Sequence, residues 1–138
     1  MKKLFILATF LSSLVMSSVV NAEWIKVLRT ESGNDVYVDF DRIKRHDGKV
    51  YYWGLVDELK PSASGTISYI FYYEADCKLF RYKWLRATYY KGPMGSGEVG
   101  YETTNSQDKN WTYPSSGRPA VTPAEIMLKA VCPIQNMQ

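Results

Sequence analysis

The sequence predicts an α+β fold: a small curved antiparallel β-sheet with one C-terminal α-helix, tied to the sheet by a disulfide. Aromatic and β-branched residues alternate with polar residues through much of residues 24–103, which is typical of half-buried strands. A helix-capping pattern begins at Thr122. Two cysteines, Cys77 and Cys132, lie at the ends of an expected strand and of the expected helix.

The first 22 residues are expected to be a secretory signal, so a single folded domain is expected over residues 23–138. Lys2 and Lys3 precede a short apolar stretch, and small residues lead to the expected cleavage after Ala22. The alternative is a retained membrane span, which needs about 20 apolar residues, whereas serines interrupt this shorter stretch. The first mature residue would be Glu23 rather than a lipid-bearing cysteine. We therefore expect a product without a stable membrane anchor, periplasmic or secreted.

The expected mature domain has nearly balanced charge. Without Lys2 and Lys3, 15 of the 17 basic residues remain against 14 acidic ones. A nucleic-acid-binding domain usually carries a basic face, so we expect no nucleic-acid partner. Aromatic residues are abundant instead, with 11 Tyr and 4 Trp, and these side chains suit the pleated surface of a sheet.

Six strands are expected in chain order, separated by turn-forming residues. Their ranges are 24–29, 36–40, 49–59, 66–77, 79–91 and 98–103. Asp47-Gly48 is a hairpin signal between the second and third strands, and the glycine-rich residues 92–97 end the fifth. Residues 41–45 are expected to form a short polar turn or one helical turn. Residues 104–120 are expected to form a surface loop held by Trp111 and Tyr113.

The last element is expected to be a helix that begins after Thr122. Thr122 is a good N-cap, Pro123 suits the first helical position, and Glu125 completes a capping box. Pro133 is expected to end the helix. An apolar stripe at helical spacing consists of Ile126, Met127, Ala130 and Val131.

The two cysteines are expected to pair, because an even number in an exported chain favours a disulfide. The bridge would tie the helix to the end of the 66–77 strand, and the chain-entropy estimate values it at about 4 kcal/mol. The alternative is a metal site, but the chain has one histidine, His46, and no Cys-x-x-Cys or His-x-x-x-His spacing. We expect no metal and no cofactor.

No group of residues in this sequence forms a recognisable catalytic site. Gly95 to Gly100 matches the dinucleotide fingerprint literally, but that motif needs a following helix in a βαβ unit. Residues 101–105 have no helical stripe, so a turn between strands is favoured. His46 adjoins an expected hairpin turn, where an exposed role is favoured over a catalytic one. The carboxylate pairs that could be imagined lie in expected turns and strand ends, so we do not expect an enzyme.

The densest basic stretch lies on the fifth expected strand and is the candidate binding site. It consists of Arg81, Lys83 and Arg86, interleaved with Tyr82 and Trp84. Such a strand could face an anionic partner or line an aromatic groove. Equally, Arg and Lys on a strand often lay their aliphatic stems over neighbouring rings and have only a structural role. The sequence leaves both interpretations open.

The order of several motifs resembles the surface-adhesin protein E-like family, over about residues 24–132. These motifs are Val36-Tyr37-Val38-Asp39, Tyr52-Trp53-Gly54-Leu55-Val56-Asp57, Glu74-Ala75-Asp76-Cys77 with Arg81-Tyr82, Gly92-Pro93-Met94-Gly95-Ser96-Gly97, and Trp111-Thr112-Tyr113-Pro114 before the helix that ends at Cys132. The resemblance implies a small antiparallel sheet, a C-terminal helix and a disulfide that joins them. It also implies relatives that bind host matrix and plasma proteins at the bacterial surface, and that can form homodimers.

These observations lead to two hypotheses from different classes. The first is an exported, non-enzymatic binding domain of the adhesin-E type with a protein partner, either a host matrix or plasma protein or a protein of the cell envelope. The second is a periplasmic protein that binds a flat apolar small molecule in an aromatic-lined pocket of the sheet. Fold likeness alone does not decide between them.

Overall fold

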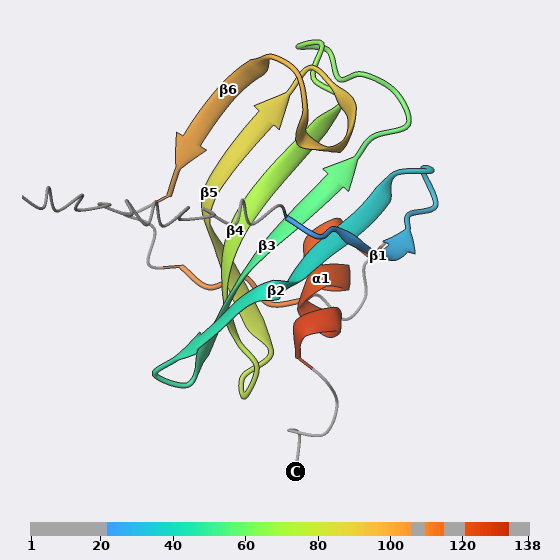
Figure 1. Cartoon of the computed structure of the whole chain (residues 1–138). Coiled ribbons are helices and arrows are strands. Elements are labelled where there is room, and N and C mark those ends of the chain that lie inside the picture. The colour runs from blue at the N-terminus through green and yellow to red at the C-terminus, as the bar shows by residue number, and fades with distance from the viewer. Residues whose placement is uncertain (1–21, 106–109, 115–120, 133–138) are drawn as a thin grey trace, which may run out of the picture.

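The computed structural model describes residues 22–105, 110–114 and 121–132 (Figure 1). The elements are β1 (Ile25–Arg29), β2 (Asp35–His46), β3 (Lys49–Asp57), β4 (Ser68–Asp76), β5 (Arg81–Tyr90), the 3₁₀ turn η1 (Pro93–Gly95), β6 (Val99–Thr104) and α1 (Pro123–Val131). Residues 1–21 of the expected leader lie outside the described residues. Within the described ranges, no helix is both long and apolar enough to cross a bilayer.

The described strands form one antiparallel sheet of six, in the order β1-β2-β3-β4-β5-β6. Every strand is therefore hydrogen-bonded to its neighbour in sequence, as the short predicted turns require. The Asp47-Gly48 hairpin between β2 and β3 is confirmed. Both residues have positive φ, 48° and 72°, and this backbone matches the twist of the two strands.

Strand β2 is longer than the sequence indicated, because residues 41–45 belong to it rather than to a polar or helical turn. Asp39 lies opposite Trp53, and Lys44 lies opposite Tyr51, so β2 contains extra residues that have no partner on β3. The buried Asp39 carboxylate stabilises this bulge, because it accepts hydrogen bonds from the backbone N–H and from Nε of Arg42, at 3.2 and 2.5 Å. The bulge allows a polar stretch to remain in the strand.

Helix α1 packs against the face of the sheet formed by β1, β2 and β3, which we call the inner face (Figure 1). The predicted capping box is present, with Glu125 N–H donating to Thr122 Oγ1 at 3.3 Å and Thr122 N–H donating to Glu125 Oε2 at 3.2 Å. Ile126, Met127 and Val131 are buried as expected, whereas Leu128 is fully buried and Ala130 only partly. The helix and the inner face share one apolar core.

Gly54 allows the close approach of α1 to β3. A Cβ atom built on Gly54 would overlap the sulfur of Met127, which is fully buried against the strand. A central strand normally gains from a side chain. Here the missing side chain is what lets the helix approach the sheet at this point.

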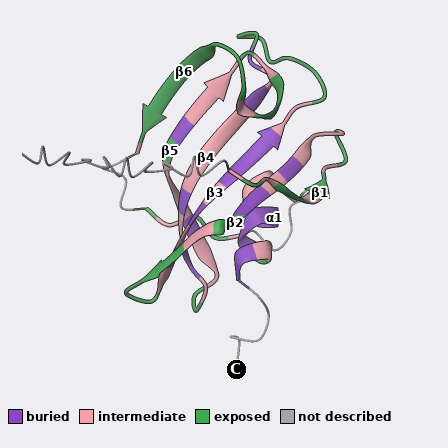
Figure 2. Cartoon of the chain, viewed as in Figure 1, coloured by how far each residue is buried: buried purple, intermediate pink, exposed green. Residues whose placement is uncertain are grey.

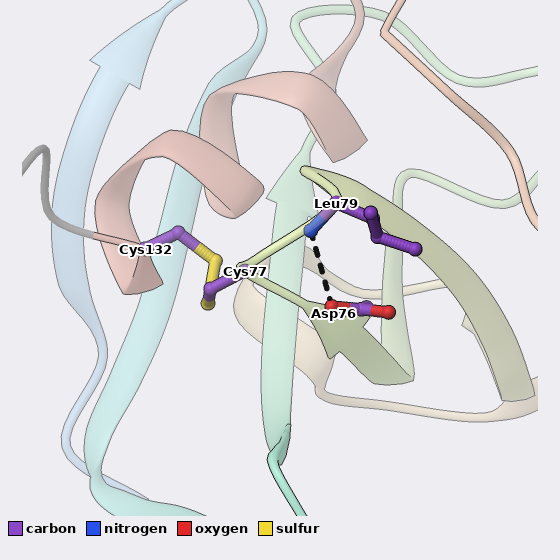
Figure 3. The surroundings of a disulfide bond; sticks show 4 residues. All are labelled: Asp76, Cys77, Leu79 and Cys132. Carbon is purple, nitrogen blue, oxygen red and sulfur yellow. Dashed lines mark hydrogen bonds between the residues drawn. A yellow bond between two sulfur atoms is a disulfide. The ribbon is translucent and has the colours of Figure 1, made fainter. Parts of the chain in front are cut away.

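The predicted disulfide joins Cys77, just after β4, to Cys132 at the C-terminal end of α1, with a Cα–Cα distance of 5.3 Å (Figure 3). The turn that carries Cys77 is held by Asp76, whose Oδ1 accepts a hydrogen bond from the Leu79 N–H at 3.2 Å. One half-cystine is thus set by a hydrogen-bonded turn and the other by a capped helix. The bridge attaches the C-terminal end of α1 to the turn that follows β4.

Replacing both half-cystines, as Cys77→Ser with Cys132→Ser, is expected to lower the free energy of unfolding by about 4 kcal/mol. The bridged residues are 55 apart in sequence, and the loss is the loop-closure entropy that the bridge removes from the unfolded chain. Urea denaturation of both proteins measures the difference. A difference below about 1 kcal/mol would contradict this role of the bridge.

Gly54→Ala is expected to destabilise the protein by about 1 to 3 kcal/mol, because the added methyl group overpacks the contact with Met127. Met127→Ala alone should cost about 2 to 5 kcal/mol through the cavity that it leaves. The double variant should then lose clearly less than the sum of the two, because the cavity accommodates the methyl group. Additive losses in thermal or urea denaturation would show that the two substitutions act independently, and would contradict a tight packing contact between Gly54 and Met127.

Candidate binding surface

The face of the sheet opposite α1, which we call the outer face, carries a row of partly exposed rings across β3 and β4. The Tyr72 ring lies between those of Trp53 and Tyr51, with ring centroids 4.6 and 6.2 Å away. These residues occupy neighbouring register positions, so their side chains share one face. Large half-exposed rings on an open sheet face are suited to contact a partner.

Two arginines flank the Trp53 and Tyr72 rings of this row. The Arg42 guanidinium lies 5.4 Å from the centre of the Trp53 ring and is held there by Asp39. On the other side, Arg86 lies opposite Tyr72 in the β4–β5 register, and its Nε donates to Glu102 Oε1 on β6 at 2.6 Å. From β2 to β5, the side chains across the sheet are therefore in the order Arg42, Trp53, Tyr72 and Arg86. Sequence patterns did not reveal it, because its members come from four separate segments.

The predicted basic strand does not present its five candidate residues on one face. Arg81, Lys83 and Arg86 lie on the outer face, whereas Tyr82 and Trp84 lie on the inner face. Tyr82 is buried, and its ring makes an edge contact with the Tyr73 ring at 5.9 Å. The Trp84 ring meets the Phe71 ring edge-on at 6.1 Å. The side chains of the two aromatic candidates therefore support the inner side of the sheet.

Arg86 shares a face with Lys83 because β5 contains a bulge between them. Lys83 lies opposite Glu74 and Arg86 opposite Tyr72, so four residues of β5 span the same stretch as three residues of β4. Strict alternation would have turned Arg86 to the inner face. The bulge instead brings it beside the Tyr72 ring.

Arg81 and Lys83 contact a ring from a distant part of the sequence, that of Trp111. The Arg81 guanidinium lies 4.4 Å and the Lys83 ammonium 4.8 Å from the ring centre. Thr112 joins this segment to β5 through two backbone hydrogen bonds with Tyr82, of 2.9 and 2.8 Å. Of the expected surface loop, residues 110–114 thus lie along β5, and 106–109 and 115–120 lie outside the described residues.

Two carboxylates anchor these cations. Arg81 binds Asp76 with its Nε and Nη2 atoms, at 3.1 and 3.0 Å, and Lys83 binds Glu74 at 3.1 Å. With the carboxylates and the Trp111 ring as partners, the geometry of Arg81 and Lys83 favours the structural interpretation of the basic strand. Arg86 is more exposed and lies beside the ring row, so its position favours contact with a partner.

The glycine-rich residues 92–97 fold back onto the outer face and belong to the scaffold. Ser68 Oγ donates to the Gly92 carbonyl at 2.6 Å and accepts from the Gly95 N–H at 2.9 Å. Gly95 has positive φ, and a Cβ there would meet the Ile70 side chain at 2.6 Å. Strand β6 follows these glycines, as the turn interpretation predicted. They connect two paired strands and cover the buried Leu55.

A hollow of about 290 Å³ lies on the outer face between the ring row and β6. Trp53, Ile70, Tyr90 and Val99 contribute apolar surface, and Arg86 and Glu102 contribute charge. His46 lies elsewhere, exposed in the β2–β3 hairpin beside Asp47, with 3.0 Å between Nε2 and Oδ2. The outer face thus offers a shallow mixed surface of rings and ion pairs.

A family model described as surface-adhesin protein E matches residues 24–133 of the chain. Two solved structures of Haemophilus influenzae protein E are similar at 15% identity. One has a TM-score of 0.55 and covers 82% of this chain and 86% of that chain. The other, from a non-typeable strain, has a TM-score of 0.53 and covers 83% and 78%. At this identity the likeness shows the fold alone. No curated protein matches the chain.

Asp76 is expected to make stability depend on acid pH. Burial alone raises its pKa, but the hydrogen bonds from Leu79 and Arg81 and the charges of Lys49 and Arg81 outweigh burial, so the pKa is lowered. A lowered folded pKa stabilises the protein above the unfolded pKa of about 3.9, and this stability is lost as the pH falls through the folded value. Asp76→Asn should therefore cost about 1 to 3 kcal/mol at pH 6 and much less at pH 2.

Urea denaturation at the two pH values measures this change. Asp41→Asn is the matched control, because Asp41 is exposed and makes no ion pair among the described residues. The control should leave the pH dependence unchanged. An equal loss for Asp76→Asn at both pH values would mean that its charge plays no part.

Proposed function

Because the chain belongs to the surface-adhesin protein E family, we propose that it is an exported, non-enzymatic binding protein whose partner is another protein. The observation that carries this proposal is the family match over residues 24–133. Membership indicates an exported protein of the adhesin type. The partner that we propose is a host matrix or plasma protein, or else a protein of the cell envelope. The proposed location is the periplasm, the medium or the outer surface.

The outer face supports a protein partner by its composition. Tyr, Trp and Arg are the residue types enriched at protein interfaces and at their energetic hot spots. Trp53, Tyr72 and Arg86 lie together there, on three adjacent strands. Paired strands hold their backbones in place, so little conformational entropy is lost on binding. We place the centre of the interface on these three residues, with Arg81 and Lys83 at its edge.

A small-molecule ligand is the alternative function, and one hollow favours it. This hollow, of about 600 Å³, lies between the β1–β2 turn and the start of α1, and Leu28, Tyr69, Val121 and Ile126 contribute apolar lining. Its size is that of ligand sites. Tyr69 is the one ring among its described lining residues, whereas the hypothesis requires several rings around a flat ligand. The ring row on the outer face therefore makes the protein partner the better supported function.

The two functions are separated by paired variants of the protein purified after export with its own leader. Arg86→Gln and Trp53→Ala are each expected to weaken binding to immobilised matrix or envelope proteins about tenfold or more, the usual loss at a hot spot. Leu28→Ala is the control, since Leu28 is exposed and lines the other hollow. It should leave protein binding unchanged, with circular dichroism confirming the fold of every variant.

The alternative predicts the reverse pattern. A thermal-shift screen of flat apolar compounds would then give a ligand whose effect disappears in Leu28→Ala and persists in Arg86→Gln. That result, together with no binding of the wild-type protein to matrix or envelope proteins, would overturn the proposal.

A further inference from the structure

Strand β6 has an open edge. Its six residues are all exposed, and it is the last strand of the sheet, paired with β5 on one side (Figure 2). Among the described residues, none pairs with its other side. A free strand edge presents a regular row of N–H and C=O groups, which is a template for one more strand.

The backbone groups that β6 presents at this edge can be identified. Asn105 N–H donates to the Leu85 carbonyl on β5 at 2.9 Å, and alternate residues of a strand turn their backbone groups to the same side. Tyr101 and Thr103 therefore bond to β5, in agreement with their register opposite Tyr89 and Ala87. Glu102 and Thr104 turn their N–H and C=O groups outward.

The opposite edge of the sheet is better protected than the Tyr101–Thr104 part of β6, because the register shift of β6 lies before that part, between Val99 and Tyr101. Strand β1 carries Lys26 and Arg29, and its register shifts between Lys26 and Leu28, as at a bulge. Charged side chains and bulges are the usual features that prevent a further strand from pairing. Strand β6, with the sequence Val-Gly-Tyr-Glu-Thr-Thr, contains no Lys, Arg or Pro. Its one charge, on Glu102, is bound by Arg86.

We propose that β6 binds an extended segment of the partner protein as an additional strand of the sheet, an inference that rests on the proposed function and specifies its binding mode. An extended polypeptide matches the outward N–H and C=O groups of Glu102 and Thr104 one for one. Main-chain hydrogen bonds supply affinity in this mode, and the side chains of β6 supply selectivity.

The side chains of β6 indicate what the added segment contains. On the inner side, the Tyr101 ring stacks on the Tyr89 ring at 4.1 Å and remains 47% exposed. An aromatic or β-branched residue opposite Tyr101 would extend this stack. On the outer side, a Lys or Arg opposite Glu102 would share its carboxylate, at the hollow that Val99, Arg86 and Glu102 line. The segment therefore alternates apolar and basic residues.

Amide hydrogen exchange with synthetic peptides tests the proposal on the exported, isotope-labelled protein. The probe is a nine-residue peptide in which valine alternates with lysine, and its control has proline in place of each second valine. When the free peptide concentration is about nine times its dissociation constant, about nine-tenths of the protein carries peptide. The amides of Glu102 and Thr104 should then exchange about tenfold more slowly. The amides of Tyr101 and Thr103 should change little, because they already bond to β5. The control peptide should have no effect.

Thr104→Pro and Thr104→Val form the matched pair of variants. Proline removes an outward N–H and no bond to β5, whereas valine keeps the N–H and the β-branched shape. Thr104→Pro should weaken peptide and partner binding about three- to tenfold, and Thr104→Val should bind as the wild type does. Unchanged β5 amide shifts would confirm that both variants keep the sheet intact.

The outcomes separate this inference from the proposed function. If matrix or envelope proteins bind the wild type and Thr104→Pro equally, and the peptide protects no β6 amide, strand addition is wrong while a protein partner stands. If the peptide protects Glu102 and Thr104 but no protein binds, strand addition stands and the proposed partner fails. If light scattering shows a dimer in which these amides are already protected, a second copy fills the edge and the inference is overturned.

Discussion

The disulfide between Cys77 and Cys132 holds α1 on the apolar face of the sheet, and the core depends on that cover. The bridge fixes the C-terminal end of α1 at the turn after β4, while the packing of Met127 onto Gly54 brings the helix against β3. A helix of nine residues would not be stable alone in water. The disulfide tether therefore matters as much as the apolar side chains of α1. Because the tether holds α1 on the inner face, the outer face of the sheet has no helical cover in the part of the chain that the structure describes.

The outer face is stabilised by means that do not require a second helix. Rings from adjacent strands stack on one another, arginines lie over or beside them, and each arginine is held by a carboxylate, as with Arg42 and Asp39 or Arg86 and Glu102. Such pairs hold the rings in place, so the aromatic surface needs no covering element to be ordered. The same features make it suitable for contact with a partner.

Local sequence signals predicted the elements well. The Asp47-Gly48 turn, the Thr122 capping box and the Cys77–Cys132 pairing each depend on chemistry within a few residues, or on the only two cysteines of the chain. Strand bulges could not be predicted in this way. The Asp39–Arg42 bulge kept residues 41–45 in β2, and the β5 bulge placed Arg86 on the outer face, because each depends on a neighbouring strand.

Contacts between distant segments also remained outside sequence reasoning. The charges of Arg81 and Lys83 marked a basic strand, but their actual neighbour is the Trp111 ring, from the segment that lies along β5. No local pattern specifies that contact. The candidate surface was therefore located in part, and its aromatic centre at Trp53 and Tyr72 emerged only from the register of β3 and β4.

Native-state hydrogen exchange before and after reduction of the disulfide tests the central claim most directly. If the bridge holds α1 on the sheet, reduction should lower the protection of the α1 amides, such as that of Cys132, which bonds to the Leu128 carbonyl, by about a thousandfold. The central amides of β3 and β4 should remain better protected than those of α1. Helix protection that is the same in the oxidised and reduced protein would contradict the account.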